Sequence, residues 1–381
     1  MKIIIKPFFL LLLMACAACE KDKNKDTADQ TPTPENYTVN ATVSTVAGSA
    51  GQSGNQDGRG SEARFSGPKK MIYDDRDQSL YIVDDPATIR KMDAQNNIST
   101  YLPAGMLSVY NSITDICLAP GAAGNLYVTT SRALYKISPS GNMAQVTTLI
   151  NNGPGNASGS FSQAELDGAC GLAAGLQDQL YFFNGTWNTL NKISFTSTNT
   201  GMVNPFAGKP LEHTSDDAWP YQDGQGLNAS FGGRVKDMAS DAGGNLYVAD
   251  YDNNVIRKIS PDGTVSSLFK RSADFDGADH YGPVSTATSN RVFNVAPSSD
   301  GSMVFFTSFG PLSPTHSNPS LRMVQPGKQV LFVAGGKVGY KDGVGGEAAF
   351  GGMDGIAVEP DGKTIYISEY SNKVIRKVSL Q

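Results

Sequence analysis

The chain has 381 residues, of which 39% are hydrophobic and 18% are charged, and its net charge is −5. A weakly acidic chain is a poor candidate for nucleic-acid binding, because phosphate contacts need clustered Lys and Arg side chains. The length alone would suggest about two or three domains, unless the chain is built from repeats. The 41 glycines and 15 tyrosines are typical of a protein rich in strands and turns.

The N-terminal segment has the pattern of a bacterial export signal. Lys2 and Lys6 precede an apolar run over residues 7–15, which is too short to be a stable membrane span. The run ends in LMAC, which resembles a lipobox whose cysteine, here Cys16, is lipidated and becomes the new N-terminus. Cys19 is the alternative, because the EKDKNKD segment that follows it resembles the acidic export signals of surface lipoproteins. An ordinary cleaved signal with incidental cysteines is a third interpretation.

These features predict three parts of the chain. Residues 1–19 are the signal peptide with its lipobox, and residues 20–40 are charged and then rich in Thr and Pro. Because this second segment has almost no apolar side chains to bury, we expect a disordered tether. The folded domain is expected to comprise residues 41–381. For such a lipid-anchored domain we expect a place in the cell envelope of a Gram-negative bacterium, as an outer-membrane lipoprotein that faces the periplasm or the cell exterior.

Within the folded domain, one sequence segment recurs: a short apolar strand that contains Tyr or Phe. Its six copies are SLYIVDD (79–85), NLYVTTS (125–131), QLYFFNG (179–185), NLYVADY (245–251), MVFFTSF (303–309) and TIYISEY (364–370). A second strand follows each copy, in TIRKMD (88–93), ALYKIS (133–138), TLNKIS (189–194), VIRKIS (255–260), SLRMVQ (320–325) and VIRKVS (374–379). A third precedes each copy, in KKMIYDD (69–75), ITDICLA (113–119), ACGLAAG (169–175), VKDMASD (235–241), RVFNVAP (291–297) and MDGIAVE (353–359). Short strands separated by Gly- and Asn-rich turns predict an all-β fold.

A fourth type of strand completes each unit and explains how the chain ends. It occurs as VSTVAG (43–48), ISTYLPAG (98–105), QVTTLIN (145–151), MVNPFAG (202–208), VSSLF (265–269) and VLFVAGG (330–336). The first copy precedes every other strand, whereas the last unit ends on VIRKVS and lacks a fourth strand. Four-stranded units at a spacing of about 40 to 65 residues predict a β-propeller, here six-bladed with four antiparallel strands per blade. We expect residues 43–48 to complete the last blade and close the ring, because closure removes exposed sheet edges.

Several segments identify the repeat more closely. DGRGSEARF (57–65), DGQGLNASF (223–231) and DGVGGEAAF (342–350) share one Asp-to-Phe spacing, and NLYVADYDNNVIRKISPDG (245–263) is similar to IYISEYSNKVIRKVS (365–379). These segments resemble the NHL repeat family, over residues 43–381 and most clearly in blades one, four and six. The resemblance implies the propeller fold. It leaves the activity open, because NHL domains mostly bind proteins, RNA or other ligands, while a few relatives are lyases, lactonases or other hydrolases.

The long loops all emerge on one face of the predicted ring, because successive strands of a blade are antiparallel. They span residues 49–67, 152–168, 209–234, 270–290 and 310–319, and we call this side the long-loop face and the other the tight-turn face. Aromatic side chains on a rigid rim suit sugar rings or the side chains of a protein partner. The candidate ligand-binding residues on this face, which could instead pack the loops onto the ring, are Trp187, Trp219, Tyr221, Tyr281 and Tyr340.

Three carboxylates recur on the innermost strands, at Asp115, Asp237 and Asp354. At the channel they could bind a divalent cation or a sugar hydroxyl, or they could accept hydrogen bonds from free main-chain N–H groups. No other cofactor is indicated, and the DG-x-G segments lack the oxygen spacing of an EF-hand, so we interpret them as sharp turns. Cys117 and Cys170 are interpreted as buried small residues, although a bond between them is conceivable in an oxidising compartment.

Two further sets of residues favour structural roles. Resemblance to the lyase relatives of the NHL family would imply a zinc site built by three histidines on the central strands. The histidines of this chain, His213, His280 and His316, fall on loops instead, so the match to that zinc site fails. Four arginines occupy equivalent positions on the third strand of their blades, the one that follows the recurring segment. We interpret them as a structural stripe whose aliphatic stems cover a neighbouring blade, and they are Arg90, Arg257, Arg322 and Arg376.

Two functions of different class remain. The first is a non-catalytic outer-membrane lipoprotein that binds a glycan or a protein partner through the long-loop face and contacts the membrane through its lipid anchor. The second is a metal-assisted hydrolase or lyase, similar to the lactonases or lyases of the family, that acts in the channel. The sequence contains no nucleophile elbow, phosphate loop or HExxH motif, and this favours the binding protein over the enzyme.

Overall fold

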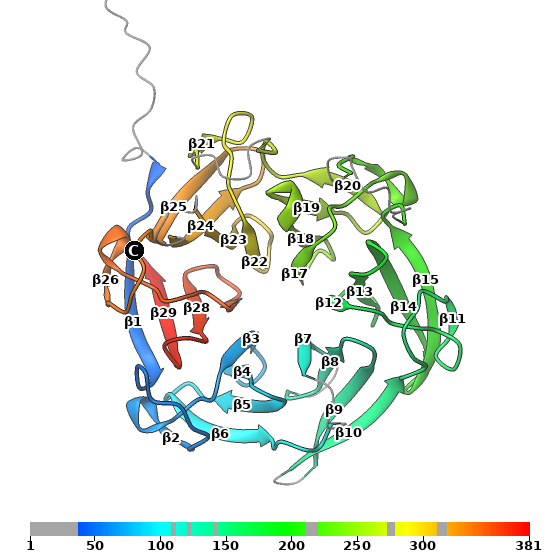
Figure 1. The fold of residues 1–381 in the computed structure, drawn as a ribbon, viewed down its shortest axis with the longest axis horizontal. Coiled ribbons are helices and arrows are strands. Elements are labelled where there is room, and N and C mark those ends of the chain that lie inside the picture. The colour runs from blue at the N-terminus through cyan, green and yellow to red at the C-terminus, as the bar shows by residue number, and fades with distance from the viewer. Residues whose placement is uncertain are drawn as a thin grey trace, which may run out of the picture. The chain divides into compact units, whose positions relative to one another are not determined.

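The computed structural model describes residues 37–107, 112–119, 123–140, 143–210, 220–272, 279–310 and 318–381. Six antiparallel sheets surround a central axis (Figure 1), which confirms the predicted all-β, six-bladed propeller. Cys16, Cys19, Trp219, His213 and His316 lie outside the described residues. Within the described ranges, no helix is long and apolar enough to cross a membrane.

Blades 1 to 3 follow the order of the chain, and the strands of each blade are named from the innermost outward. Blade 1 consists of β3 (Pro68–Asp74), β4 (Ser79–Asp84), β5 (Thr88–Met92), β6 (Asn97–Leu102) and β2 (Gly58–Arg59). Blade 2 consists of β7 (Ile113–Leu118), β8 (Leu126–Thr130), β9 (Leu134–Ser140) and β10 (Met143–Ile150). Blade 3 consists of β12 (Ala169–Ala174), β13 (Leu180–Asn184), β14 (Thr189–Ser197), β15 (Thr200–Ala207) and β11 (Gly159–Ser160).

Blades 4 to 6 repeat the same plan. Blade 4 consists of β17 (Val235–Ser240), β18 (Leu246–Asp250), β19 (Val255–Ile259), β20 (Thr264–Ser267) and β16 (Gly224–Gln225). Blade 5 consists of β22 (Val292–Pro297), β23 (Val304–Phe309), β24 (Pro319–Gln325), β25 (Gln329–Gly335) and β21 (Gly282–Pro283). Blade 6 consists of β27 (Gly355–Val358), β28 (Thr364–Glu369), β29 (Val374–Leu380), β1 (Ala41–Gly48) and β26 (Gly343–Val344).

The ring is closed by the first strand of the fold, as expected from the missing fourth strand of the last unit. β1 pairs with β29 in antiparallel register from Ala41 opposite Leu380 to Gly48 opposite Val374. In Figure 1 the blue β1 therefore lies beside the red β29, although the two strands come from opposite ends of the fold. Ala41, Val43 and Ala47 of β1 are at most 1% exposed, so closure also buries apolar surface.

The blades contain one feature that the four-strand prediction missed. In every blade except blade 2, the long loop adds a two-residue fifth strand to the outer edge, within the residues that the structure describes. In blades 1, 4 and 6 this strand leads into a short 3-10 turn, at Gly60–Glu62, Gly226–Asn228 and Gly345–Glu347. The first residue of each turn has a φ of 53°, 53° and 48°, in the left-handed region that favours glycine. The repeated glycines are thus explained by backbone geometry.

Buried ion pairs tie this outer loop to the blade in blades 1, 4 and 6. In blade 4, the Arg257 side chain is fully buried, and its Nη1 donates a hydrogen bond of 3.0 Å to Oδ2 of Asp250 at the end of β18. Its Nη2 donates one of 2.8 Å to Oδ1 of Asp223, the aspartate of the DGQG segment. Arg376 of blade 6 makes the matching bonds to Glu369 and Asp342, at 2.5 and 2.7 Å. Arg90, Arg257 and Arg376 of the predicted stripe therefore fasten blades 1, 4 and 6 to their own outer loops. The prediction from the sequence places them against a neighbouring blade instead.

Phenylalanines fill the space between neighbouring blades. Phe65, Phe231 and Phe350 close the repeated Asp-to-Phe segments, and all three are fully buried. Phe231 of blade 4 lies 5.4 Å from Phe183 of blade 3, centroid to centroid, with the rings nearly perpendicular. It belongs to an apolar cluster shared by these two blades. Edge-to-face ring contacts and burial of this kind stabilise the seam between blades.

Candidate functional site

The register of the sheets shows which residues occupy equivalent positions around the channel. Met71, Ile116, Leu172, Met238, Val295 and Ile356 each lie opposite the central residue of the second strand of their blade. The residues just before them therefore form one ring, with a single member from each blade: Lys70, Asp115, Gly171, Asp237, Asn294 and Gly355. We call these six residues the channel ring. Two of the predicted aspartates, Asp115 and Asp237, belong to it.

The Lys70 side chain lies among the other members of the channel ring, and no role for this residue was predicted from the sequence. Its ammonium forms a salt bridge with Asp237 of the opposite blade. It also donates hydrogen bonds to the carbonyl oxygen of Lys236 at 3.2 Å and to Oδ1 of Asn294 at 3.5 Å. Burial lowers the pKa of Lys70, but the carboxylates of Asp237 and Asp115 outweigh it, so that the pKa is raised overall. The ammonium is therefore held in its charged form and its three donors are all in use.

The two channel aspartates also join neighbouring blades through main-chain hydrogen bonds. Asp115 accepts from the N–H of Ile116 at 2.8 Å and from that of Leu172 in blade 3 at 2.7 Å. Asp237 accepts from the N–H of Val295 in blade 5 at 2.9 Å. Burial raises the pKa of Asp115 to about 7, with Lys70 opposing and Asp237 adding to the shift. Bonding of main-chain N–H groups at the channel was one of the two roles that the sequence left open for these residues.

Asp354 lies apart from the other two predicted aspartates. Gly355, not Asp354, occupies the channel-ring position of blade 6, where a Cβ would stand 2.0 Å from the carbonyl oxygen of Lys69. Asp354 is one residue earlier, and its Oδ2 accepts a hydrogen bond of 2.8 Å from the N–H of Tyr370. Burial raises the pKa of Asp354. The structure thus brings Asp115 and Asp237 together through Lys70 and leaves Asp354 at the mouth on the long-loop side.

A central cavity lies above the channel ring, toward the tight-turn face. Its volume is about 320 Å³, and the inner strands of the six blades build its walls, together with the turns that follow β3, β17, β22 and β27. Small apolar side chains line it, among them Cys117, Ala173, Ala239, Ala296 and Ala357. Cys117 and Cys170 are both free thiols, and burial raises the pKa of both, to about 12 for Cys170. The cavity is therefore an apolar funnel with Lys70, Asp115 and Asp237 at its floor.

The four described members of the predicted aromatic set, Trp187, Tyr221, Tyr281 and Tyr340, lie in different blades. Tyr221, Tyr281 and Tyr340 each lie over a buried arginine, with the guanidinium carbon 5.0 to 5.1 Å from the ring centroid. Tyr340 nevertheless remains 45% exposed, and its hydroxyl lies 2.9 Å from Oγ1 of Thr45. Trp187, in the turn between β13 and β14, is 39% exposed. A role in ligand binding stays a prediction for all of them.

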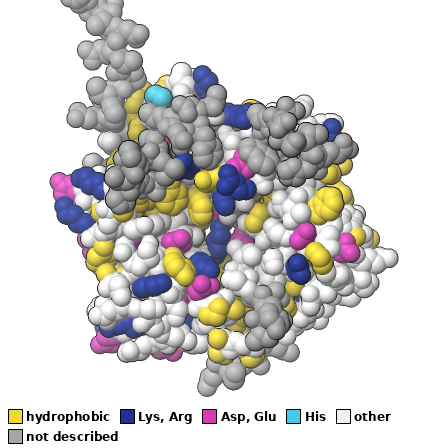
Figure 2. Space-filling model, viewed as in Figure 1, with side chains coloured by type: hydrophobic (Ala, Val, Ile, Leu, Met, Phe, Trp, Pro, Cys, Tyr) yellow, Lys and Arg dark blue, Asp and Glu magenta, His cyan; other side chains and the backbone are white. Residues whose placement is uncertain are grey.

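A second group on the long-loop face combines cations with aromatic rings at the channel mouth. The Lys236 ammonium lies 5.2 Å from the ring centroid of Tyr251 and 5.5 Å from that of Phe293. The guanidinium carbon of Arg234 lies 4.8 Å from the Tyr251 centroid. Burial and the nearby Arg234 lower the pKa of Lys236. In the view of Figure 2, Lys and Arg side chains gather around the middle of the ring, with Asp and Glu side chains beside them.

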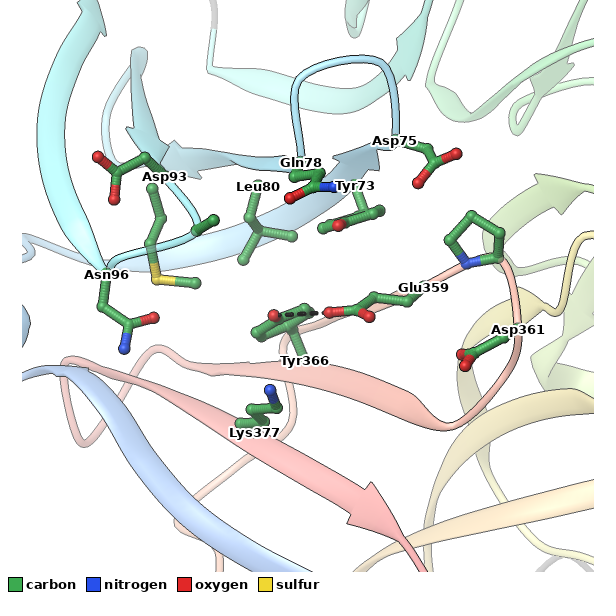
Figure 3. A pocket seen from close by; sticks show the side chains of 13 residues that line it. Tyr73, Asp75, Gln78, Leu80, Asp93, Asn96, Glu359, Asp361, Tyr366 and Lys377 are labelled. Carbon is green, nitrogen blue, oxygen red and sulfur yellow. Dashed lines mark hydrogen bonds between the residues drawn. The ribbon is translucent and has the colours of Figure 1, made fainter.

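A larger cavity lies on the tight-turn face, between blades 1 and 6. We call it the blade 1–6 cleft, and its volume is about 470 Å³. Figure 3 shows the Tyr73 and Tyr366 rings facing each other in this cleft, with centroids 6.2 Å apart and an interplanar angle of 14°. Asp75, Glu359 and Asp361 project into the same space from the turns above and below (Figure 3). The sequence does not reveal this cleft, because each blade supplies only part of it.

No three described His, Cys, Asp or Glu residues are grouped closely enough to hold a metal ion. In the channel ring, the position that a cation would take between Asp115 and Asp237 faces the Lys70 ammonium. His280 is the one described histidine, and its Nδ1 lies 2.9 Å from Oγ1 of Thr288. The described part of the chain therefore offers paired carboxylates, aromatic rings and apolar walls, which are the elements of a binding site.

The six sheets define a six-bladed β-propeller, in which charged side chains of the channel pair with one another. Comparisons with known proteins support this class of fold. No family model and no curated protein matches the chain. Among solved structures it is similar to an auxiliary nutrient binding protein from Bacteroides thetaiotaomicron, with a TM-score of 0.64, 18% identity, and coverage of 90% of this chain and 77% of that one. A protein with the same description from Bacteroides ovatus gives a TM-score of 0.63, 15% identity, and coverage of 91% and 78%.

An enzyme shares the architecture as well. A catalytically inactive variant of virginiamycin B lyase from Staphylococcus aureus gives a TM-score of 0.51 and 12% identity, with coverage of 90% of this chain and all of that one. Likeness at these identities shows the fold alone, and the NHL resemblance stays a prediction.

Proposed function

We propose that this chain is a non-catalytic binding protein of the cell envelope, which holds a glycan or a protein partner on its long-loop face. The structures of the two Bacteroides nutrient binding proteins support a binding role, because they have the same fold over most of their length. The export signal, Cys16 or Cys19 as lipid anchor, and the tether of residues 20–40 support a place at the outer membrane.

One observation carries the preference for binding over catalysis. The carboxylates that a channel enzyme would use as metal ligands or as a base are already engaged by the ammonium of Lys70 and by main-chain N–H groups. Removing a carboxylate from such a pair would leave the other charge buried and uncompensated. The channel ring therefore favours a structural role, which leaves ligand recognition to the faces of the propeller.

The test is a glycan array probed with the soluble domain, residues 41–381. We expect at least one glycan to bind, and we expect Trp187→Ala to weaken that binding by about tenfold or more, as for a stacking anchor. Leu227→Ala is the matched control, because Leu227 is also exposed, at 51%, but lies at the outer edge of blade 4. Equal losses in both variants, or the absence of any glycan hit together with the absence of a captured protein, would count against the proposal.

The alternative is a metal-assisted hydrolase or lyase that acts in the channel. The observation in its favour is the buried carboxyl of Asp115, whose pKa of about 7 is unusual and which lies at the floor of a cavity. This alternative requires Lys70 to leave the channel ring when a divalent cation enters. Elemental analysis of protein purified without chelator separates the two: stoichiometric metal that is lost in Asp237→Asn would favour the enzyme.

A further inference from the structure

The blade 1–6 cleft has features that suit a ligand different from the one proposed for the long-loop face. We propose that this cleft binds an organic cation with two or more ammonium groups, such as a polyamine. The proposal does not rest on the proposed function, since the cleft is on the opposite, tight-turn face of the ring.

Three carboxylates occupy equivalent places in blades 1, 4 and 6. By the register of the sheets, Asp74, Asp241 and Glu359 each lie three residues after the equivalent inner-strand positions Met71, Met238 and Ile356. In blade 1, Asp74 is neutralised by Arg76, which donates from Nε at 2.7 Å and from Nη2 at 2.8 Å.

The corresponding carboxylate of blade 4 is also satisfied within the chain, whereas that of blade 6 is not. Asp241 accepts from the main-chain N–H and the side-chain amide of Asn245, at 2.9 and 2.8 Å, and from the Tyr247 hydroxyl at 2.9 Å. From the described residues, the Glu359 side chain accepts a hydrogen bond only from the Tyr366 hydroxyl, at 2.9 Å to Oε1. Among the described residues, Oε2 of Glu359 has no donor, and neither carboxylate oxygen of Asp75 has one. Blade 6 is thus the place where this repeated carboxylate is left available.

The electrostatic field of the cleft also favours a cation. Its lining includes four carboxylates, from Asp75, Asp93, Glu359 and Asp361, and only one cationic side chain, Lys377. Asp93 is occupied by its own turn, through the N–H groups of Gln95 and Asn97. Burial raises the pKa of Tyr73, and the carboxylates of Glu359, Asp75, Asp77 and Asp361 raise it further. A field that disfavours a tyrosinate at this point favours a bound cation.

An organic cation fits the cleft better than a metal ion does. No three carboxylates of the described chain are close enough to coordinate one ion. The carboxylates of the cleft are instead spread along a volume of about 470 Å³, which fits a ligand of several bonded atoms. The Tyr73 and Tyr366 rings add aromatic surface, on which ammonium groups and their methylene neighbours bind favourably. The cleft also shares Tyr73, Asp75 and Pro360 with the apolar central cavity, so that an alkyl chain has room to continue there.

Isothermal titration of the purified protein with spermidine at low ionic strength tests this inference. We expect binding in wild type, and a loss of affinity of about tenfold or more in the double variant Asp75→Asn, Glu359→Gln, which keeps the acceptor for the Tyr366 hydroxyl. Asp178→Asn is the matched control: it removes one negative charge from an exposed turn of the same face, outside the cleft, and should change affinity by less than about twofold.

Two further measurements separate a built site from a diffuse negative surface. Tyr73→Leu should weaken spermidine binding several-fold without changing the net charge, because it removes the aromatic wall. Magnesium at the same ionic strength should not displace spermidine more effectively than sodium does. No binding, unchanged affinity in the double variant, or displacement of spermidine that is more effective with magnesium than with sodium would overturn the proposal. Since none of these results involves the long-loop face, they are independent of the glycan and partner experiments.

Discussion

Blade 4 and blade 3 are neighbours with the same five-stranded plan, yet different side chains hold them together. In blade 4 a buried arginine, Arg257, pairs with Asp250 and with Asp223 of the outer loop. The register places Asn191 of blade 3 at the position of Arg257, because it lies opposite Phe182 as Arg257 lies opposite Val248. Blade 3 therefore has no charge at the point where blade 4 has its central ion pair.

The residue that pairs with the arginine in blade 4 is also replaced by a neutral one in blade 3. Asn184 of blade 3 occupies the position of Asp250, and its amide donates at 3.1 Å to the carbonyl oxygen of Gly155 and to Oδ1 of Asn156 in the outer loop. The outer loop is fastened in both blades, by a network of charges in one and of neutral amides in the other. In these two blades the same link between blade and loop is thus made by different chemistry, and the buried cation of blade 4 lies beside its carboxylates.

Blade 6 has the same kind of ion pair as blade 4, but in blade 6 the network of the pair connects strands from the beginning and the end of the domain. Arg376 on β29 bonds Asp342 at 2.7 Å, and Asp342 accepts a hydrogen bond from the main-chain N–H of Thr45 on β1 at 3.0 Å. The network of blade 6 therefore depends on a strand that comes from the start of the domain. In blade 4 the equivalent acceptor, Asp223, bonds Ser267 of the same blade at 3.1 Å.

The largest effect is expected from removing that strand. A chain that begins after Ser49 lacks β1, exposes the edge of β29, and loses the burial of Ala41, Val43 and Ala47. We expect its melting temperature, measured by circular dichroism, to fall by about 10 °C or more relative to a chain that begins at Asn40. If the two chains melt at the same temperature, β1 does not close the ring.

An intermediate effect is expected from breaking the ion pair of blade 4. Arg257→Leu leaves the fully buried carboxylate of Asp250 without its cation, which should cost about 3–5 kcal/mol of unfolding free energy in urea titrations. Asn191→Leu is the matched variant of blade 3, where no buried charge is left behind, and its cost should be about 1–3 kcal/mol. Equal losses of unfolding free energy in the two variants would mean that the buried ion pair of blade 4 matters no more for stability than the neutral hydrogen bonds of blade 3.

Much of this architecture is readable in the sequence, because short strands with strict order leave few ways to close a ring. The positions of single residues are less readable, since equivalence depends on register. Lys70 belongs to the same ring as Asp115 and Asp237, but it has the opposite charge, and no pattern of residue type connects it to them. The blade 1–6 cleft was missed for a related reason. Its walls come from turns near both ends of the domain, and Glu359 differs from Asp74 and Asp241 only in the donors that reach it.

The smallest effect is expected at the channel, where blades 2 and 4 carry the same residue in different surroundings. Lys70 forms its salt bridge with Asp237, while burial raises the pKa of Asp115 to about 7, well above the ordinary value of 3.8. The folded state therefore holds a proton that the unfolded state releases between about pH 4 and pH 7. Stability contributed by the protonated Asp115 is full below that window and is lost as the pH rises through it.

Asp115→Asn should remove this loss, because an amide does not titrate. Urea midpoints measured at pH 5 and pH 8 should differ less in the variant than in wild type, by an amount equivalent to about 1–2 kcal/mol. Asp178→Asn, on an exposed turn, should keep the wild-type difference. An unchanged difference in Asp115→Asn would place the titrating group elsewhere in the ring. It would also mean that the Lys70 ammonium compensates Asp115 as fully as it compensates Asp237, so that blades 2 and 4 share one cation equally.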